Sequence, residues 1–233
     1  MLSPESSRVD PAETTAWLRR RLQDFLASYA SARPVRSIAV VGNAPLLPDE
    51  ARAHAVDSAD LVVRVNSFAL DAAGDPPCLG SRVDAILVNR ATRLTPWFLR
   101  DYRSKAFLQS DTALVHATGF RRRPAQHWPA DLGVWQVPND AVVAPLRALI
   151  WQDADGARVD PTTGTLAAWL AYLLFPEAEL RITGLSYLDE RKPQTWDHHA
   201  GRVAVPVSTA HRVDREGTLI NSWVRAGRAV ALP

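Results

Sequence analysis

The short, continuous apolar runs of this chain constrain its fold more than any other feature. Three of them end in asparagine, namely SIAVVGN, LVVRVN and VDAILVN, which begin at Ser37, Leu61 and Val83. Runs of this length, separated by segments rich in Asp, Glu and Ala, are the pattern of a parallel sheet with both faces covered. We therefore predict an α/β fold with a Rossmann-like, mostly parallel sheet flanked by helices.

The rest of the chain continues this alternation of strands and helices. Further strands are predicted at Thr112–His116 and Leu180–Thr183. A helix is predicted over Thr165–Phe175, because helices usually end before a proline and Pro176 follows. The segment Gly119–Asp140 is rich in Pro, Trp and Arg, and its apolar residues follow neither the helical nor the strand spacing. We therefore predict a long loop of a kind that often carries function.

Length and charge indicate one globular domain and no nucleic-acid partner. The chain has 233 residues, of which 47% are hydrophobic and 22% charged, which is enough for a real core. Its formal net charge is only +2. The run Arg121–Arg123 is either solvated or faces an anionic acceptor, and without regularly spaced aromatic partners it does not indicate nucleic-acid binding.

Residues 1–34 are predicted to form an N-terminal amphipathic helix, followed by a single domain over residues 35–233. Apolar residues, Trp17 and Leu18 among them, recur at helical spacing over Pro11–Ala30, beside the run Arg19–Arg21. Packing on the domain is favoured, and peripheral binding to a membrane is the alternative.

The expected compartment is a reducing cytosol. Cys78 is the single cysteine and cannot form an internal disulfide, and the N-terminus lacks the basic and apolar regions of a secretory signal. No run approaches the roughly 18 apolar residues of a membrane-spanning helix. We therefore expect a cytoplasmic protein, with a peripheral contact to the inner membrane as the alternative.

Asparagines end the predicted strands at the edge where open α/β sheets bind their ligands. They are Asn43, Asn66 and Asn89. An amide suits the edge of a pyrimidine, a ribose or a phosphate oxygen without adding charge, although any single one is equally well explained as a turn residue. Their recurrence favours a ligand site. Gly42 lacks the further glycines of a dinucleotide fingerprint, and no phosphate-loop lysine follows it.

The sequence Thr162-Thr163-Gly164 precedes the predicted helix Thr165–Phe175. Hydroxyls and free backbone N–H groups at such a position form either a simple helix cap or a site for an anion or nucleotide.

Histidines are concentrated toward the C-terminus, where His198, His199 and His211 precede Glu216. A near-neutral imidazole can take a proton from an acceptor hydroxyl while a second one donates to a departing phosphate, and exposure on the surface is the alternative for any one of them. A zinc site is disfavoured because no recognisable ligand spacing is complete.

The sequence Asp153-Ala154-Asp155 has the form by which many glycosyltransferases hold a divalent metal. It runs directly into Gly156, which is typical of an exposed turn, and we favour the turn.

Together these segments resemble the motifs of the sialyltransferases of glycosyltransferase family 29, in the same order, between Ile38 and Val230. The large motif is similar to IAVVGN, VDSADLVVRVNSF and LGSRVDAILVN, and the small motif is similar to PTTGTLAAWLAYLLFPEAELRITGL. The very small motif, His-x-x-x-x-Glu, matches His211 to Glu216, and the third motif's histidine corresponds to His198 or His199.

The resemblance implies the GT-A-variant fold of these enzymes and an inverting transfer without metal or other cofactor. It also implies a role for each matching residue: Asn43 and Asn66 contact CMP, Thr162, Thr163 and Gly164 line the nucleotide pocket, Gly184 lies beside it, His198 or His199 binds the donor phosphate, His211 is the catalytic base, and Glu216 shapes its surroundings.

Both motif cysteines of the family are absent here, which fits a reduced cytosol and a soluble, bacterial-type enzyme that builds surface glycans such as lipopolysaccharide or capsule. The expected substrates are a CMP-activated sialic acid or a related keto acid sugar such as Kdo, and a glycan acceptor. The alternatives are a catalytically inactive nucleotide-binding domain of the same fold and a Rossmann-type oxidoreductase, which would require the missing glycines.

Overall fold

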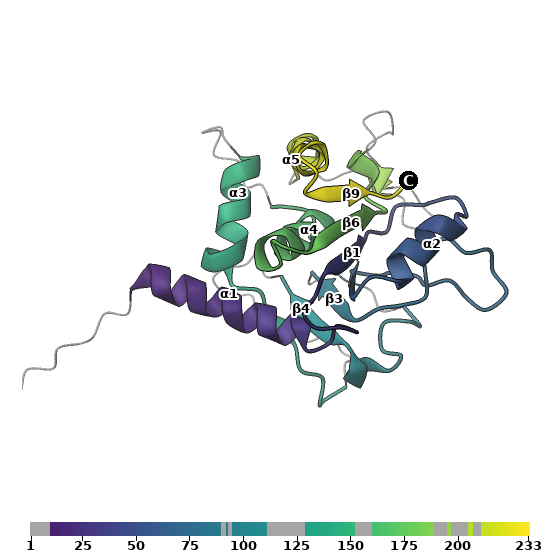
Figure 1. Cartoon of the computed structure of the whole chain (residues 1–233), viewed down its shortest axis with the longest axis horizontal. Coiled ribbons are helices and arrows are strands. Elements are labelled where there is room, and N and C mark those ends of the chain that lie inside the picture. The colour runs from purple at the N-terminus through teal and green to yellow at the C-terminus, as the bar shows by residue number, and fades with distance from the viewer. Residues whose placement is uncertain are drawn as a thin grey trace, which may run out of the picture.

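A parallel sheet organises the protein. The computed structural model describes residues 10–89, 92, 95–110, 129–151, 160–188, 195–196, 205–206 and 211–233. Within them lies a seven-stranded sheet in which every neighbouring pair is parallel (Figure 1). Its strands are β1 (Ser37–Val41), β2 (Leu61–Val65), β3 (Ala85–Val88), β4 (Ala106–Gln109), β5 (Trp135–Gln136), β6 (Glu179–Thr183) and β9 (Ala229–Ala231). The predicted α/β class is confirmed.

The order of the strands reverses beside β1. Across the sheet they run β5-β4-β3-β2-β1-β6-β9, so the chain first builds outward from β1 in one direction and then returns to add β6 on its other side. Where the order reverses, the two connections leave the carboxyl ends of the strands in opposite directions. A crevice therefore forms outside the carboxyl ends of β1 and β6, which is the usual ligand position in open α/β sheets.

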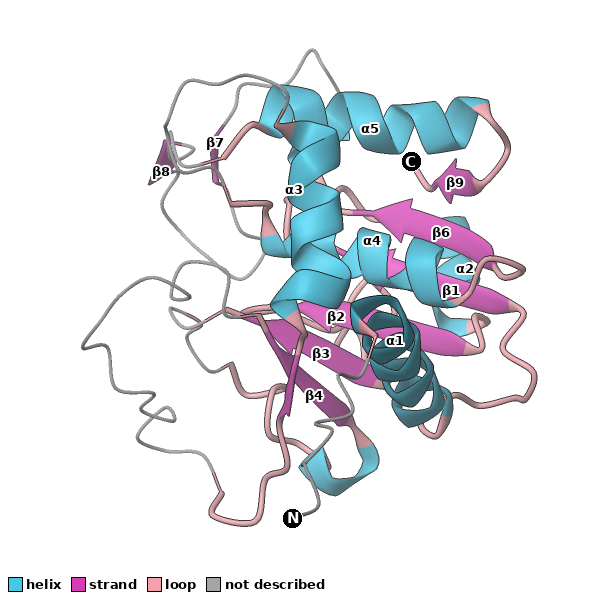
Figure 2. Cartoon of the chain, turned by 90° about the vertical axis from the view of Figure 1, so that its left-hand side faces the viewer, coloured by secondary structure: helices cyan, strands magenta, loops and turns pink. Residues whose placement is uncertain are grey.

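Helices cover both faces of the sheet (Figure 2). The α-helices of the described residues are α1 (Pro11–Ala27), α2 (Glu50–Asp57), α3 (Ala144–Ile150), α4 (Thr163–Leu174) and α5 (Val213–Arg225). Shorter elements are the 3₁₀ turns η1 (Tyr102–Ser104) and η3 (Ser186–Leu188), the π-helical turn η2 (Asn139–Val143), which continues into α3, and the antiparallel pair β7 (Thr195–Trp196) and β8 (Val205–Pro206).

The two faces of β1 enter different cores. Ile38 and Val40 belong to the larger core, which is shared with α1, α3, α4 and α5. Ala39 and Val41 belong to a smaller core on the opposite face, under α2. Because side chains alternate along a strand, consecutive residues of a strand covered on both sides enter apolar cores, so such strands are mostly apolar. This is the physical reason for the continuous apolar run in the sequence.

The predicted elements differ from the observed ones at several points. Helix α4 begins at Thr163, before the predicted Thr165, because Thr162 caps it and accepts a hydrogen bond from the Thr165 N–H. The first helix ends at Ala27, before the predicted Ala30. The strands β4, β5 and β9 were not predicted, and β5 lies inside the predicted loop Gly119–Asp140. The predicted strand Thr112–His116 lies outside the described residues.

Helix α1 packs on the domain through Leu22 and Leu26, which are buried in the larger core. The Arg19 side chain also donates to the Ala141 carbonyl at 2.9 Å. Trp17, by contrast, is 54% exposed. None of the helices in the described part of the chain combines the length and the apolar character that crossing a bilayer requires.

Two glycines allow the ends of β1 and β6 to approach each other closely. Gly184 has a φ of +69°, and a Cβ added to it would lie 2.8 Å from the Gly42 carbonyl oxygen. A Cβ on Gly42 would overlap the Gly184 backbone in turn. The close approach is held by the Gly42 N–H, which donates to the Thr183 carbonyl at 2.8 Å, and by the Ala44 N–H, which donates to the Gly184 carbonyl at 2.9 Å.

We expect Gly184→Ala to destabilise the fold more than Gly227→Ala. Gly227 has nearly the same φ, +68°, but no atom lies within 4 Å of an added Cβ. Both variants carry the left-handed backbone cost of about 1–2 kcal/mol, and Gly184→Ala adds a steric term of about 1–3 kcal/mol. Urea unfolding of the two variants measures the difference, and equal losses would contradict the close approach of β1 and β6.

Candidate active site

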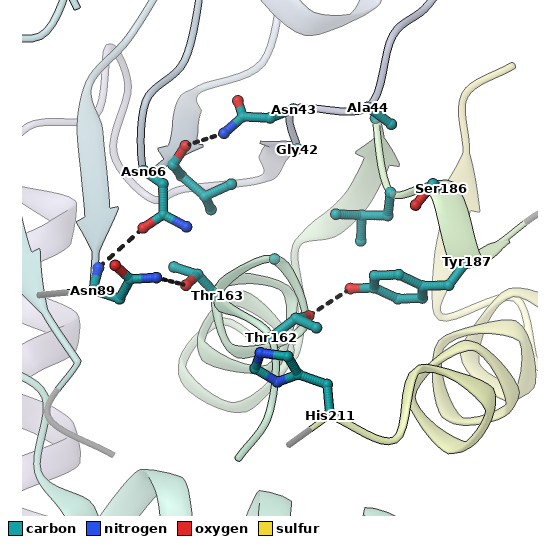
Figure 3. A pocket seen from close by; sticks show the side chains of 14 residues that line it. Gly42, Asn43, Ala44, Asn66, Asn89, Thr162, Thr163, Ser186, Tyr187 and His211 are labelled. Carbon is teal, nitrogen blue, oxygen red and sulfur yellow. Dashed lines mark hydrogen bonds between the residues drawn. The ribbon is translucent and has the colours of Figure 1, made fainter. Parts of the chain in front are cut away.

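A cavity of about 350 Å³ lies at the carboxyl ends of the central strands, where the strand order reverses (Figure 3). Its volume is within the range of small-ligand sites. The residues predicted from the sequence that line it are Asn43, Asn66, Asn89, Thr162, Thr163, Gly164, Gly184 and His211. The fold thus brings together groups that are widely separated along the chain.

Neighbouring backbone and hydroxyl groups orient the amides of the three asparagines, and Asn89 Nδ2 donates to the Thr163 hydroxyl at 3.4 Å. Asn43 Nδ2 lies 2.8 Å from the Val65 carbonyl, which can only accept, so Oδ1 is the acceptor that Asn43 presents. Asn66 Oδ1 accepts from the Asn89 N–H at 3.0 Å and from the Thr92 hydroxyl at 2.9 Å. The Asn66 Nδ2 therefore points toward the middle of the cavity as a donor (Figure 3).

Asn66 directly follows β2 in the left-handed conformation, with a φ of +49°. Asn adopts this conformation more readily than most residues with a Cβ. This backbone turn accounts for an asparagine at the end of the strand. The turn also leaves the Nδ2 of its amide directed into the cavity.

The N-terminus of α4 forms another wall of the cavity. Thr162 caps the helix through its Oγ1, which accepts from the Thr165 N–H at 3.1 Å. The N–H groups of Thr163 and Gly164, in the first turn, have no partner within the helix and carry its positive dipole end. Leu185 packs so closely that a Cβ on Gly164 would lie 2.5 Å from its Cδ2. This end of α4 can therefore bind an anion through its backbone.

Glu216 lies fully buried behind this helix terminus. Its carboxylate accepts from the Thr162 N–H at 3.1 Å, from the Thr162 hydroxyl at 2.6 Å and from the Thr165 hydroxyl at 2.5 Å. The Tyr187 hydroxyl lies 3.0 Å from Thr162 Oγ1 and 2.6 Å from Thr165 Oγ1. One network therefore joins the first turn of α5, the start of α4 and η3.

Burial raises the pKa of Glu216, because the charged carboxylate loses its hydration. Hydrogen bonds from Thr162 and Thr165 and the charge of His211 counteract the shift only in part. Burial also raises the pKa of Tyr187, and the neighbouring Glu216 adds to that shift, so the phenol stays protonated and can donate its one hydrogen to either threonine hydroxyl.

His211 stands at the mouth of the cavity, just before α5. Its Nδ1 lies 2.6 Å from the Asp160 carbonyl oxygen. Since a carbonyl can only accept, Nδ1 carries the proton, and in the neutral ring Nε2 is the basic nitrogen. The Asp160 carboxylate forms an ion pair with Arg147 of α3.

Several predicted residues lie outside the described part of the chain. They are His198, His199, Asp153, Asp155 and the run Arg121–Arg123. Among the residues that the structure does describe, no group of three or more His, Cys, Asp or Glu side chains could hold a metal ion.

Several residues of the site were not predicted from the sequence. Leu185, Ser186 and Tyr187 line the cavity directly after Gly184. Their signal was their position at the carboxyl end of a predicted strand, the criterion that had identified the asparagines. Arg147 and Asp160 gave no comparable signal, because their pairing joins α3 to a segment between helices.

The fold is shared with crystal structures of mammalian sialyltransferases. One, in complex with Gal-beta-1-3GalNAc-ortho-nitrophenol, is similar over 100% of this chain and 89% of its own, with a TM-score of 0.58 and 16% identity. Another mammalian sialyltransferase is similar over 100% of this chain and 88% of its own, with a TM-score of 0.53 and 15% identity. The expected sialyltransferase-like fold is thereby confirmed.

No family model matches the sequence, and no curated protein matches it either.

The pKa of Glu216 predicts a pH dependence of stability. Because the folded-state pKa is raised above its ordinary value of 4.5, the contribution of this group is fully present below that pH. It is lost as the pH rises through the folded pKa. In Glu216→Gln this loss is absent, so the stability advantage of the wild type should be largest below pH 4.5 and narrow above it.

Urea unfolding at a series of pH values measures the free energy of unfolding of the wild type and of Glu216→Gln. A difference that stays constant or widens with rising pH would show that Glu216 is not a carboxyl with a raised pKa.

Proposed function

We propose that the protein is an inverting, metal-independent glycosyltransferase. It would move a sialic acid or a related keto acid sugar, such as Kdo, from a CMP donor to a hydroxyl of a glycan acceptor. The sialyltransferase fold supports the class of reaction, and the chemistry of the cavity supports the individual steps.

The observation that carries the proposal is the orientation of His211. Its Nδ1 is held by the Asp160 carbonyl, so the neutral ring keeps Nε2 as the base at the edge of a ligand-sized cavity. A base at this position can take the proton of an acceptor hydroxyl as its oxygen attacks the anomeric carbon. The bond from that carbon to the phosphate oxygen breaks, its electron pair leaves with CMP, and attack from the opposite face inverts the centre.

The donor would be held mainly by neutral groups. Among the described residues that line the cavity there is neither an arginine nor a lysine. The free N–H groups at the start of α4 and the Asn66 Nδ2 are suited to phosphate oxygens, and the Asn43 Oδ1 is suited to a hydroxyl or an exocyclic amine. These groups match a nucleotide monophosphate leaving group.

Charge on the leaving phosphate would be stabilised by the helix terminus together with His198 or His199. A preformed helix dipole and an imidazole donor do the work that a metal ion does in other glycosyltransferases. For this reason the proposal assigns no metal to Asp153 and Asp155.

The acceptor is proposed to be the terminus of a surface glycan, as in lipopolysaccharide or capsule. The neighbour that is bound to Gal-beta-1-3GalNAc-ortho-nitrophenol supports a glycan acceptor for this fold. A cytoplasmic location at the inner membrane goes with this proposal, since Trp17 is 54% exposed on α1 and the exposed Arg20 and Arg21 follow it. Such a pairing suits a membrane surface.

Two other functions would use the same fold. A catalytically inactive nucleotide-binding domain would bind CMP without transfer, and an oxidoreductase would bind NAD. The tautomer of His211 favours the transferase, because binding alone requires no base.

We expect His211→Ala to lower turnover by about 10²- to 10⁴-fold, the usual contribution of a general base, while CMP binding stays nearly unchanged. His54→Ala is the matched control, because this histidine is exposed on α2, over the opposite face of the sheet. Transfer is measured with a labelled CMP-sugar donor in the presence of EDTA, and CMP binding by calorimetry.

Unchanged turnover in His211→Ala would refute the assignment of the base. If EDTA abolished wild-type activity and Mg²⁺ or Mn²⁺ restored it, transfer would not be metal-independent. A metal site at Asp153 and Asp155 would then be favoured.

A further inference from the structure

Asp160 connects His211 to helix α3 through two different groups. Its backbone carbonyl accepts from His211 Nδ1 at 2.6 Å, and its carboxylate pairs with the guanidinium of Arg147 on α3. The side chains of the pair are 24% exposed for Arg147 and 16% for Asp160, so most of the interaction is shielded from water.

We propose that the Arg147–Asp160 ion pair is a positioning device for the base, which sets the tautomer and the ring plane of His211. The proposal rests on the proposed function for its effect on turnover. Its effect on the tautomer does not depend on that function.

Helix α3, which carries the Arg147 end of the ion pair, is firmly packed in the core. Arg147 lies in α3, whose Leu146 and Ile150 are completely buried in the larger core. Asp160 itself lies outside any helix or strand, directly before Pro161. A residue before proline is restricted to extended backbone conformations, but the peptide plane that carries its carbonyl can still tilt. The ion pair to α3 supplies the remaining restraint on the direction of the carbonyl.

A carbonyl in a fixed direction decides which nitrogen of the ring carries the proton. If the Asp160 carbonyl turned away, the proton could move to Nε2, and the nitrogen facing the cavity would change from an acceptor to a donor. The ring would then present a hydrogen to the acceptor hydroxyl and could not take its proton. Breaking a pair whose residues do not line the cavity would therefore reduce the rate of the chemical step.

Three further ionisable groups near the ring belong to the described residues. Glu216 is buried behind Thr162, and its charge acts on His211 from α5. Arg212, next to His211 in the chain, pairs with Asp214 at 3.0 Å. Tyr187 stays protonated because burial raises its pKa. The variants below leave all of these groups in place.

Arg147→Met removes the ion pair and keeps a similar apolar stem, and Asp160→Ala removes the carboxylate together with its hydrogen bond to Arg147. Arg147→Lys keeps the charge and should restore function. Arg181→Met is the matched control, since Arg181 pairs with Glu179 at the opposite end of β6, far from the cavity.

Two measurements are made on each full-length variant. Nitrogen NMR of protein labelled with ¹⁵N-histidine reports the tautomer, with His211→Gln to assign the signal. Steady-state kinetics with a CMP-sugar report kcat and KM. We expect Nδ1–H in the wild type, in Arg147→Lys and in the Arg181→Met control.

In Arg147→Met and Asp160→Ala we expect the proton to shift toward Nε2 and kcat to fall about 10- to 100-fold, which is the usual effect of misplacing a catalytic group. The donor KM should change little. A wild-type tautomer in Asp160→Ala would overturn the inference, even if Arg147→Met failed to fold. A shifted tautomer in a protein without any transferase activity would support the positioning role and overturn the proposed function.

Discussion

The buried carboxylate of Glu216 is the interaction on which the candidate site depends. It lies in the first turn of α5 and receives three hydrogen bonds from Thr162 and Thr165 at the start of α4. A buried carboxylate is costly unless it is fully hydrogen-bonded, so these two helix termini are held in one relative position. His211 precedes α5 and is thereby brought beside the free N–H groups of α4.

The sheet supplies the other half of the site. Because the strand order reverses between β1 and β6, a crevice opens at their carboxyl ends, and Gly42 and Gly184 let the two chain segments approach closely beneath it. The turn after β2 then directs the Asn66 amide into the same space. Hydrogen-bonding groups from the sheet and the imidazole of His211, just before α5, consequently face one cavity. This arrangement is compatible with the proposed transfer reaction between two substrates.

Much of this arrangement could be predicted from residue patterns. The strands β1, β2 and β3 are buried along almost their whole length, and their mostly apolar runs are long enough to be recognised. In β6 the buried Leu180 and Ile182 gave the signal, although Glu179 is exposed. Strand ends and the Thr-Thr-Gly turn then indicated the cavity wall. The strands β5 and β9 escaped prediction because they have only two and three residues, and pairing with a neighbour defines such short strands more than their own sequence does.

The contacts that hold His211 in place could not be predicted in the same way. The spacing of His211 and Glu216 was visible in the sequence, but the contacts of Glu216 with Thr162 and the pairing of Arg147 with Asp160 arise only when α3, α4 and α5 pack together. No local pattern encodes such a contact, since each partner is an ordinary polar residue in its own segment.

The most direct test of the central claim is a comparison of CMP, UDP, GDP and NAD as ligands of the unmodified protein by thermal unfolding. A ligand at 100 times its Kd stabilises the folded state by about 2.7 kcal/mol, which is a readily measured rise in Tm. We expect CMP to raise the Tm and the other three ligands to leave it unchanged. A rise with NAD or UDP, and none with CMP, would show that the cavity does not bind a CMP donor.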